Sequence, residues 1–247
     1  MVGFKQQGFS LVEMAVVLVI LGFVISALIL PVSAQRDVAY QQQTEKQLEL
    51  ATKALIGFAQ THGRLPCPAT AASNGLEAVL LLGVQGGGQC DPSAYMLPAA
   101  TLGIKPVNDK GQALDGWSNP IFYKADQTNR GGSALPDFTT TNEISLIGIE
   151  VLRPEIRICA TSSNCNDTNY LVNNAVAVIY SLGKTGAQVL TGDASGGADE
   201  NANLDGDNIF VSHDIRANDP NGRFDHVLTW ISPYVLYNAM IQAGQLP

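Results

Sequence analysis

The sequence predicts an α+β fold, in which one long N-terminal α-helix is laid against a small antiparallel β-sheet domain. Three observations lead to this prediction. A charge-free apolar run covers residues 14–30, and an amphipathic pattern with helical spacing follows it up to residue 62. Beyond residue 62 the chain has short β-branched and aromatic runs bounded by Gly, Asn or Pro, which is typical of strands.

The N-terminal stretch "GFSLVEMAVVLVILGFVISALIL", from Gly8 to Leu30, is long enough to cross a bilayer as a helix. No second stretch of this kind follows, and Lys5 precedes it, so we expect a single span with the following domain outside the cytoplasm. Glu13 is the one carboxylate inside this stretch. Because a charge in a bilayer is costly, Glu13 is expected to have a partner and a function.

Two simpler explanations of this stretch stay open. The sequence "VSAQ" at residues 32–35 offers a cleavage site for a secretory signal, although the apolar run is longer than such signals usually have. In a plain uncleaved anchor, Glu13 would only extend its carboxylate toward the membrane interface.

The amphipathic part is expected to be a stalk helix that packs on the domain. Its apolar residues recur every three or four positions: Leu48, Ala51, Leu55, Phe58 and Ala59. Gly63 and Pro66 are expected to end it. Either one helix runs from Phe9 to His62, or two helices join near Pro31 and Ser33.

Beyond the helix, the segments with strand-like composition are 119–125, 143–152, 174–183, 208–215 and 226–232. Segments 76–83 and 234–247 look helical instead. We see no repeat and no linker, so residues 63–247 are predicted to form one globular α+β domain.

Composition and cysteines limit the function. The net charge is −8 and no cluster of Lys and Arg occurs, so nucleic acid is not expected as a partner. An exported domain with an even number of cysteines predicts two disulfides, most simply between sequence neighbours, and the alternative is four free thiols. The cysteines are Cys67, Cys90, Cys159 and Cys165.

The residues Gly8, Phe9 and Glu13, followed by the apolar run, resemble the processing site of type IV prepilins and pseudopilins. The resemblance implies a leader at 1–8, a transmembrane and polymerisation helix at 9–32, a stalk helix at 33–62 and a globular domain at 63–247. It also implies that a prepilin peptidase cuts between Gly8 and Phe9 and methylates the new amine. Glu13 would then pair with the Phe9 amine of a neighbouring subunit. Because removing one member of a buried ion pair is costly, such a pair fixes the register of assembly.

Two later segments are similar to segments of the major pseudopilins of type II secretion. They are "DGWSNPIFY" at Asp115–Tyr123 and "YSLGKTG" at Tyr180–Gly186. The resemblance is firm over roughly the first sixty residues and moderate in these two places.

The acidic stretch of residues 191–215 contains carboxylates separated by Gly and Asn, a composition that suits Ca²⁺. The candidate ligands are Asp199, Asp205, Asp207 and Asp214, with Asn203 beside them, and an EF-hand spacing is absent. Resemblance to the major pseudopilins, which bind calcium in the corresponding loop, favours a structural calcium ion. The alternative is a solvated acidic loop.

Catalysis is not expected. The three histidines are isolated from any nucleophile motif. Asp225 and His226 are adjacent, and adjacent side chains on a strand point to opposite faces. Phosphate-binding and dinucleotide-binding motifs are missing too.

The sequence therefore predicts a pseudopilin or minor pilin of a bacterial inner membrane, with its domain in the periplasm or in an extracellular filament. Its partners would be the prepilin peptidase, other pilin-like subunits and an inner-membrane assembly platform. The competing class is an exported, membrane-tethered binding or enzymatic domain that does not polymerise.

Overall fold

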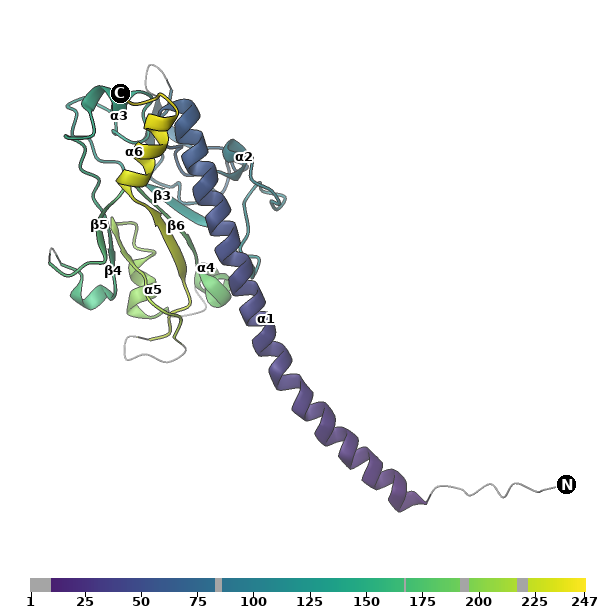
Figure 1. Cartoon of the computed structure of the whole chain (residues 1–247). Coiled ribbons are helices and arrows are strands. Elements are labelled where there is room, and N and C mark those ends of the chain that lie inside the picture. The colour runs from purple at the N-terminus through teal and green to yellow at the C-terminus, as the bar shows by residue number, and fades with distance from the viewer. Residues whose placement is uncertain (1–9, 83–85, 167, 192–195, 217–221) are drawn as a thin grey trace. The chain divides into compact units, whose positions relative to one another are not determined.

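The computed structural model describes residues 10–82, 86–166, 168–191, 196–216 and 222–247, with the side chains of residues 27–34 left aside. The chain divides into two compact units, Met1–Tyr40 and Gln41–Pro247. Helix α1 (Leu11–His62) contributes residues 11–40 to the first unit and residues 41–62 to the second (Figure 1).

Helix α1 continues without a break through position 31, so the sequence forms one helix here rather than two. In the first unit the side chains of residues 11–26 are exposed all round, and most of them are apolar. No helix in the described part of the chain has the length and hydropathy that crossing a membrane requires. The predicted span of 9–32 is therefore not found among the described residues, and position 9 lies outside them.

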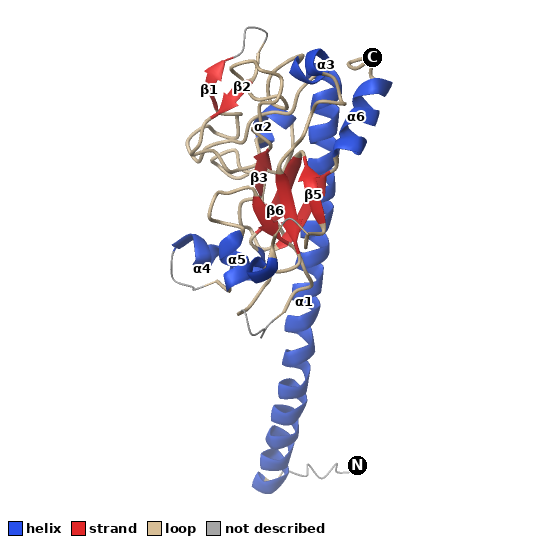
Figure 2. Ribbon diagram, turned by 90° about the vertical axis from the view of Figure 1, so that its left-hand side faces the viewer, coloured by secondary structure: helices blue, strands red, loops and turns tan. Residues whose placement is uncertain are grey.

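The central sheet of the second unit contains β3 (Phe122–Ala125), β6 (Ala177–Ser181) and β8 (Val227–Ile231), all antiparallel with β6 in the middle. Figure 2 shows this sheet against α1. Tyr123 pairs with Ile179, which pairs with Thr229 on the other side. The predicted strands around 122, 174–183 and 226–232 are confirmed.

Alternation along these strands gives the sheet two apolar faces. Tyr123 and Ile179 point to the core that includes Leu55 of α1, whereas Val178 and Tyr180 point to a second core. Helix α1 contributes four buried residues to the first core, as their helical spacing predicts: Leu48, Ala51, Leu55 and Ala59.

A second small sheet covers the other face of the central sheet. It has the order β5 (Val172–Ala175), β4 (Ile156–Cys159), β7 (Ile209–Val211). Strands β4 and β5 are antiparallel, but β4 and β7 run parallel, which the expectation of a purely antiparallel sheet did not include. Ile156, Ile158 and Phe210 fill the core between the two sheets.

The remaining elements are short. The helices are α2 (Ala99–Leu102), α3 (Glu143–Ile147), α4 (Gly186–Thr191), α5 (Ala198–Ala202) and α6 (Pro233–Gln242), and 3₁₀ turns lie at Ser162–Asn164 and Gly183–Thr185. Helix α6, predicted as helical, lies beside the end of α1 in both views (Figures 1 and 2). Gln60 donates a side-chain hydrogen bond to the Ala239 carbonyl at 3.1 Å, which joins the two helices.

Two predicted segments have the opposite secondary structure. Segment 76–83 was expected to be helical, but Val79–Leu82 forms β1, which pairs with β2 (Gly88–Cys90). Segment 143–152 was expected to be a strand, but it forms α3 and then turns. Ile144 and Ile147 share one face of α3 against the core, and Gly148 ends the helix with φ +81°.

Two disulfides join sequence neighbours: Cys67 to Cys90 and Cys159 to Cys165. The first ties the chain just after α1 to β2, and the second closes the turn that follows β4.

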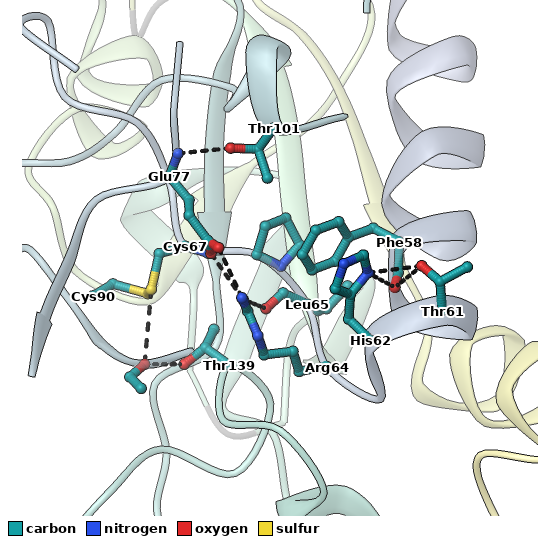
Figure 3. Close-up of polar contacts among 12 residues, drawn as sticks. Phe58, Thr61, His62, Arg64, Leu65, Cys67, Glu77, Cys90, Thr101 and Thr139 are labelled. Atoms are coloured by element: carbon teal, nitrogen blue, oxygen red, sulfur yellow. Dashed lines mark hydrogen bonds and ion pairs between the residues drawn. A yellow bond between two sulfur atoms is a disulfide. The ribbon is translucent and has the colours of Figure 1, made fainter. Parts of the chain in front are cut away.

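A polar cluster fixes the chain where α1 ends (Figure 3). Buried Arg64 donates to both carboxylate oxygens of Glu77, at 2.8 and 2.7 Å, and its guanidinium lies 5.1 Å from the centre of the Phe58 ring. The Cys67 N–H also donates to Glu77. Burial raises the pKa of Glu77, but the hydrogen bonds and charge of Arg64 outweigh it and hold that pKa below the usual value.

Candidate functional sites in the N-terminal motif and the acidic segment

Positions 8 and 9, between which the predicted cut falls, lie outside the described residues. The described residues begin at Ser10, immediately before α1. The Ser10 carbonyl accepts the first helical hydrogen bond, from the Met14 N–H at 3.2 Å, so Ser10 is the N-cap of α1.

Ser10 and Glu13 form a reciprocal capping box. The Glu13 N–H donates to the Ser10 hydroxyl at 3.2 Å, and the Ser10 N–H donates to Glu13 Oε2 at 3.2 Å. The pattern Ser-x-x-Glu before an apolar run is a known signal for such a box, and it was missed in reading the sequence. Glu13 therefore has a partner within its own chain.

The capping box does not exhaust what the Glu13 carboxylate can accept. An ionised carboxylate offers about four lone-pair sites, and the Ser10 N–H uses one of them. The N-terminus of a helix also favours a negative charge. The carboxylate thus keeps free lone pairs at the beginning of α1 and can still accept hydrogen bonds from a cationic amine.

The two segments that resemble major pseudopilins come together in a buried polar network. The Ser181 hydroxyl donates to Asp115 Oδ2 at 2.5 Å, and the Asn119 amide donates to the Gly183 carbonyl at 2.7 Å. Asp115 Oδ1 also accepts the backbone N–H groups of Trp117 and Asn119. Burial raises the pKa of Asp115.

This network needs a glycine at position 183. Gly183 has φ +66°, and a Cβ there would lie 2.0 Å from the Asp225 carbonyl oxygen. The Thr44 hydroxyl of α1 accepts the Gly116 N–H at 2.9 Å, so the turn at 115–119 is also tied to the helix. The turn at 115–119 therefore contacts both α1 and the end of β6 within the second unit.

The four predicted calcium ligands do not gather at one point. Asp199, on α5, is buried and accepts hydrogen bonds from the Ser162 N–H and hydroxyl at 2.7 and 2.6 Å. His213 Nε2 lies 3.3 Å from its other oxygen. Asp214 is exposed. Asp199 thus holds the turn after β4 in place through contacts with its own chain.

Asp205 and Asp207 lie in an exposed turn where Lys124 supplies a positive charge. Lys124 Nζ donates to the carbonyls of Gly206 and Asp207, both at 2.7 Å. Burial lowers the pKa of Lys124, and burial together with the nearby Asp205 raises the pKa of Asp207. Carbonyls of this kind are also ligands for Ca²⁺, so calcium binding in this turn stays a prediction.

A different group of metal-ligand residues is brought together. One ligand atom from each of Glu200, Asp225 and His226 lies within 4.8 Å of the others, and all three side chains are buried. Burial raises the pKa of Glu200 and lowers that of His226 to about 3, so the imidazole is neutral.

The expectation that Asp225 and His226 point to opposite faces was wrong. Both residues precede β8, which begins at Val227, so strict strand alternation does not apply to them. Glu200 lies 25 positions before Asp225, and no spacing in the sequence indicates that it contacts Asp225 and His226.

Comparison with known proteins bears on the N-terminal motif. Residues 3–29 match the family described as "Prokaryotic N-terminal methylation motif". No curated protein and no solved structure matches the chain. The match includes Gly8, Phe9 and Glu13 and confirms the resemblance read from them. The chain carries, at residues 3–29, the N-terminal signal of type IV prepilin-like proteins.

Proposed function

We propose that the chain is a pseudopilin or minor pilin, a structural subunit of a filament assembled at the bacterial inner membrane for protein secretion or as a pilus. A prepilin peptidase removes residues 1–8 and methylates the amine of Phe9. The mature subunit then polymerises through the N-terminal part of α1 and carries its globular domain on the filament. The chain is a substrate of the peptidase and has no catalytic task of its own.

The observation that carries this proposal is the methylation motif at 3–29, in which Glu13 is followed by mostly apolar helical residues whose side chains, at 14–26, are exposed. A helix that is apolar on every side needs to be covered, either by lipid or by other helices. A filament core built from such helices provides the cover after the subunit leaves the membrane. Residues 14–30 carry no charged side chain, so within 13–30 only Glu13 can fix how far one helix is shifted along its axis against the next.

The pairing of Glu13 with the Phe9 amine of a neighbour supplies register. In a low-dielectric core an unpaired carboxylate is strongly unfavourable, so subunits pack only where the amine of one meets Glu13 of the next. Within the second unit, the network of Asp115, Asn119 and Ser181 ties α1 to the sheet. That contact holds residues 41–62 of α1 against the domain within the second unit.

The proposal is tested by the mass of the N-terminal peptide of the protein recovered from membranes of cells that express a prepilin peptidase. We expect a chain that begins at Phe9 and carries one methyl group. The variant Gly8→Ala is expected to keep Met1 and the whole leader, because the peptidase of this family cuts after glycine. Gly3→Ala, in the same leader, is the matched control and is expected to be processed normally.

Two other results would favour the competing class. A chain beginning at Gln35 indicates secretory cleavage, and an intact Met1 in the wild-type protein indicates a plain membrane anchor. In either case the exported domain would not enter a pilin-like filament, and a binding or enzymatic task would have to be sought in the domain.

A further inference from the structure

Glu200, Asp225 and His226 form a compact buried group with no assigned role. Glu200 lies on α5, and the other two residues lie just before β8, so the group joins two elements distant in sequence. Their relative exposures are 0%, 6% and 3%. Glu200 lies in the acidic stretch 191–215, but none of the three is among the four residues predicted as calcium ligands.

Two polar atoms of this group lack partners. Glu200 Oε2 and His226 Nε2 are buried and have no hydrogen-bond partner among the residues that the structure describes. The other Glu200 oxygen accepts the Asp225 N–H at 2.9 Å, and Asp225 Oδ2 accepts the Thr185 N–H at 2.9 Å. Buried polar atoms are rarely left unpaired, so these two point to a missing partner.

The electrostatic balance also favours a cation. Two carboxylates face each other in a buried space, and within the described residues neither forms an ion pair with Lys or Arg. The charge of Arg223 acts on Glu200, but the Nε atom of Arg223 is itself buried with no partner in the described part of the chain. A bound cation would compensate both carboxylates at once.

We propose that Glu200, Asp225 and His226 bind a divalent transition-metal ion of the Zn²⁺ class. Imidazole together with carboxylates is a donor set that Zn²⁺ accepts, with three protein ligands and water completing four-coordination. Zinc–ligand distances are about 2.0–2.2 Å, so ligand atoms already within 4.8 Å converge on one ion after small side-chain rotations. Ca²⁺ takes six to eight oxygens and does not suit an imidazole with two carboxylates.

Asn203 sets the condition for binding through Nε2. The backbone of Val211 fixes the Asn203 amide: Oδ1 accepts the Val211 N–H at 2.7 Å, and Nδ2 donates to the Val211 carbonyl at 3.1 Å. The same Nδ2 faces His226 Nδ1 at 3.1 Å, which places the ring proton on Nε2. Zinc binding moves this proton to Nδ1 and breaks the Asn203 contact. The variant Asn203→Asp offers Nδ1–H an acceptor and is expected to tighten zinc binding.

The test uses the full-length protein in detergent, refolded with Zn²⁺ or with chelator, because buried ligands meet the metal during folding. We expect about one bound zinc per chain by elemental analysis. At free Zn²⁺ about one hundred times Kd, Tm is expected to rise by about 5–10 °C. Glu200→Gln and His226→Gln are expected to lose both effects, whereas His213→Gln and Asp214→Asn are matched controls that keep them.

Co²⁺ substitution gives a readout that does not depend on stability. Tetrahedral Co²⁺ absorbs in the visible, and this absorption should be absent in His226→Gln and stronger at a given Co²⁺ concentration in Asn203→Asp. Zinc stoichiometry unchanged by His226→Gln would overturn the proposal, as would absence of zinc from the refolded wild type. A Tm rise given by Ca²⁺ alone, lost in Asp205→Asn and kept in His226→Gln, would assign the cation to the acidic turn instead.

Discussion

At the scale of single residues, Glu13 has two separable interactions. Its carboxylate caps α1 by accepting the Ser10 N–H, and in the proposed filament it also accepts the amine of a neighbouring subunit. The first needs only a hydrogen-bond acceptor, which glutamine also provides, whereas the second needs a negative charge. Substitutions of Ser10 and of Glu13 can therefore separate the two interactions.

Arg64 and Glu77 form the buried ion pair at the end of α1, with side-chain exposures of 7% and 20%. Glu77→Gln is expected to lower the free energy of unfolding by about 3 kcal/mol, because it leaves the Arg64 guanidinium buried without its counter-charge. Urea unfolding of the full-length protein in detergent, followed by tryptophan fluorescence, measures the change.

Glu49→Gln is the control for Glu77→Gln. Glu49 pairs with Lys53 on the exposed side of α1, with side-chain exposures of 65% and 68%, and such pairs contribute little. We expect no measurable change from this variant. Equal losses in both variants would mean that burial of the Arg64 pair is not what stabilises the chain there.

The same pair predicts a pH dependence. Because the pKa of Glu77 is lower in the folded chain than in the unfolded chain, its contribution is fully present above its unfolded pKa. The contribution is lost as the pH falls through the lower, folded pKa. The difference in Tm between the wild type and Glu77→Gln should therefore shrink when the pH is lowered from 6 to about 3. A difference that grows toward acid would contradict this assignment.

Sequence reading found the residues that act through local pattern and missed those that act through contacts distant in the chain. Gly8, Phe9 and Glu13 stand close together before an apolar run, so the motif is visible in one window. Glu200 meets His226, and Arg64 meets Glu77, through the tertiary fold and not through a local pattern. Periodicity in the sequence does not predict contacts of this kind.

At the scale of elements, the part of α1 in the second unit is stabilised mainly by its apolar face. Leu55→Ala is expected to lower the free energy of unfolding by about 2–5 kcal/mol, because Leu55 is fully buried against the central sheet. Leu50→Ala is the matched control, since Leu50 lies in the same helix with 51% of its surface exposed. Chemical unfolding of both variants compares them, and a similar cost for the two would show that α1 does not pack as described.

The elements predicted best are those whose burial follows a simple period. The spacing of apolar residues in α1 and the alternation in β3 and β6 each match their cores. Strand β1 was missed because its leucines suggest a helix, whereas the backbone of Ala78, just before it, is held by hydrogen bonds to Pro68 and Asp91. Segment 143–152 was predicted as a strand because its apolar residues alternate, although Gly148, which ends α3, interrupts that pattern.

At the scale of the whole molecule, each unit has one distinct task in the proposed function. Residues 11–26 of the first unit offer an apolar helix with a charge at its beginning, which suits polymerisation. The second unit has two cores, two disulfides and a fixed helix end, which suit a stable domain outside the cytoplasm.

The capping box and the charge pair differ in what they predict for assembly. Ser10→Ala weakens the cap by about 0.5–2 kcal/mol but leaves the Glu13 charge, so this variant is expected to be processed and to enter filaments. Glu13→Ala removes both interactions and is expected to be processed without entering filaments. Sheared filament fractions and membranes, compared by immunoblot, give the distribution of each variant.

Glu13→Gln gives the most direct measurement, because it keeps the capping box and removes only the charge. We expect Glu13→Gln to be cut before Phe9 and to remain in the membrane, with at least a tenfold loss from the filament fraction (about 1.4 kcal/mol or more). Incorporation of Glu13→Gln into filaments at the wild-type level would contradict the pairing of this carboxylate with a neighbour's amine.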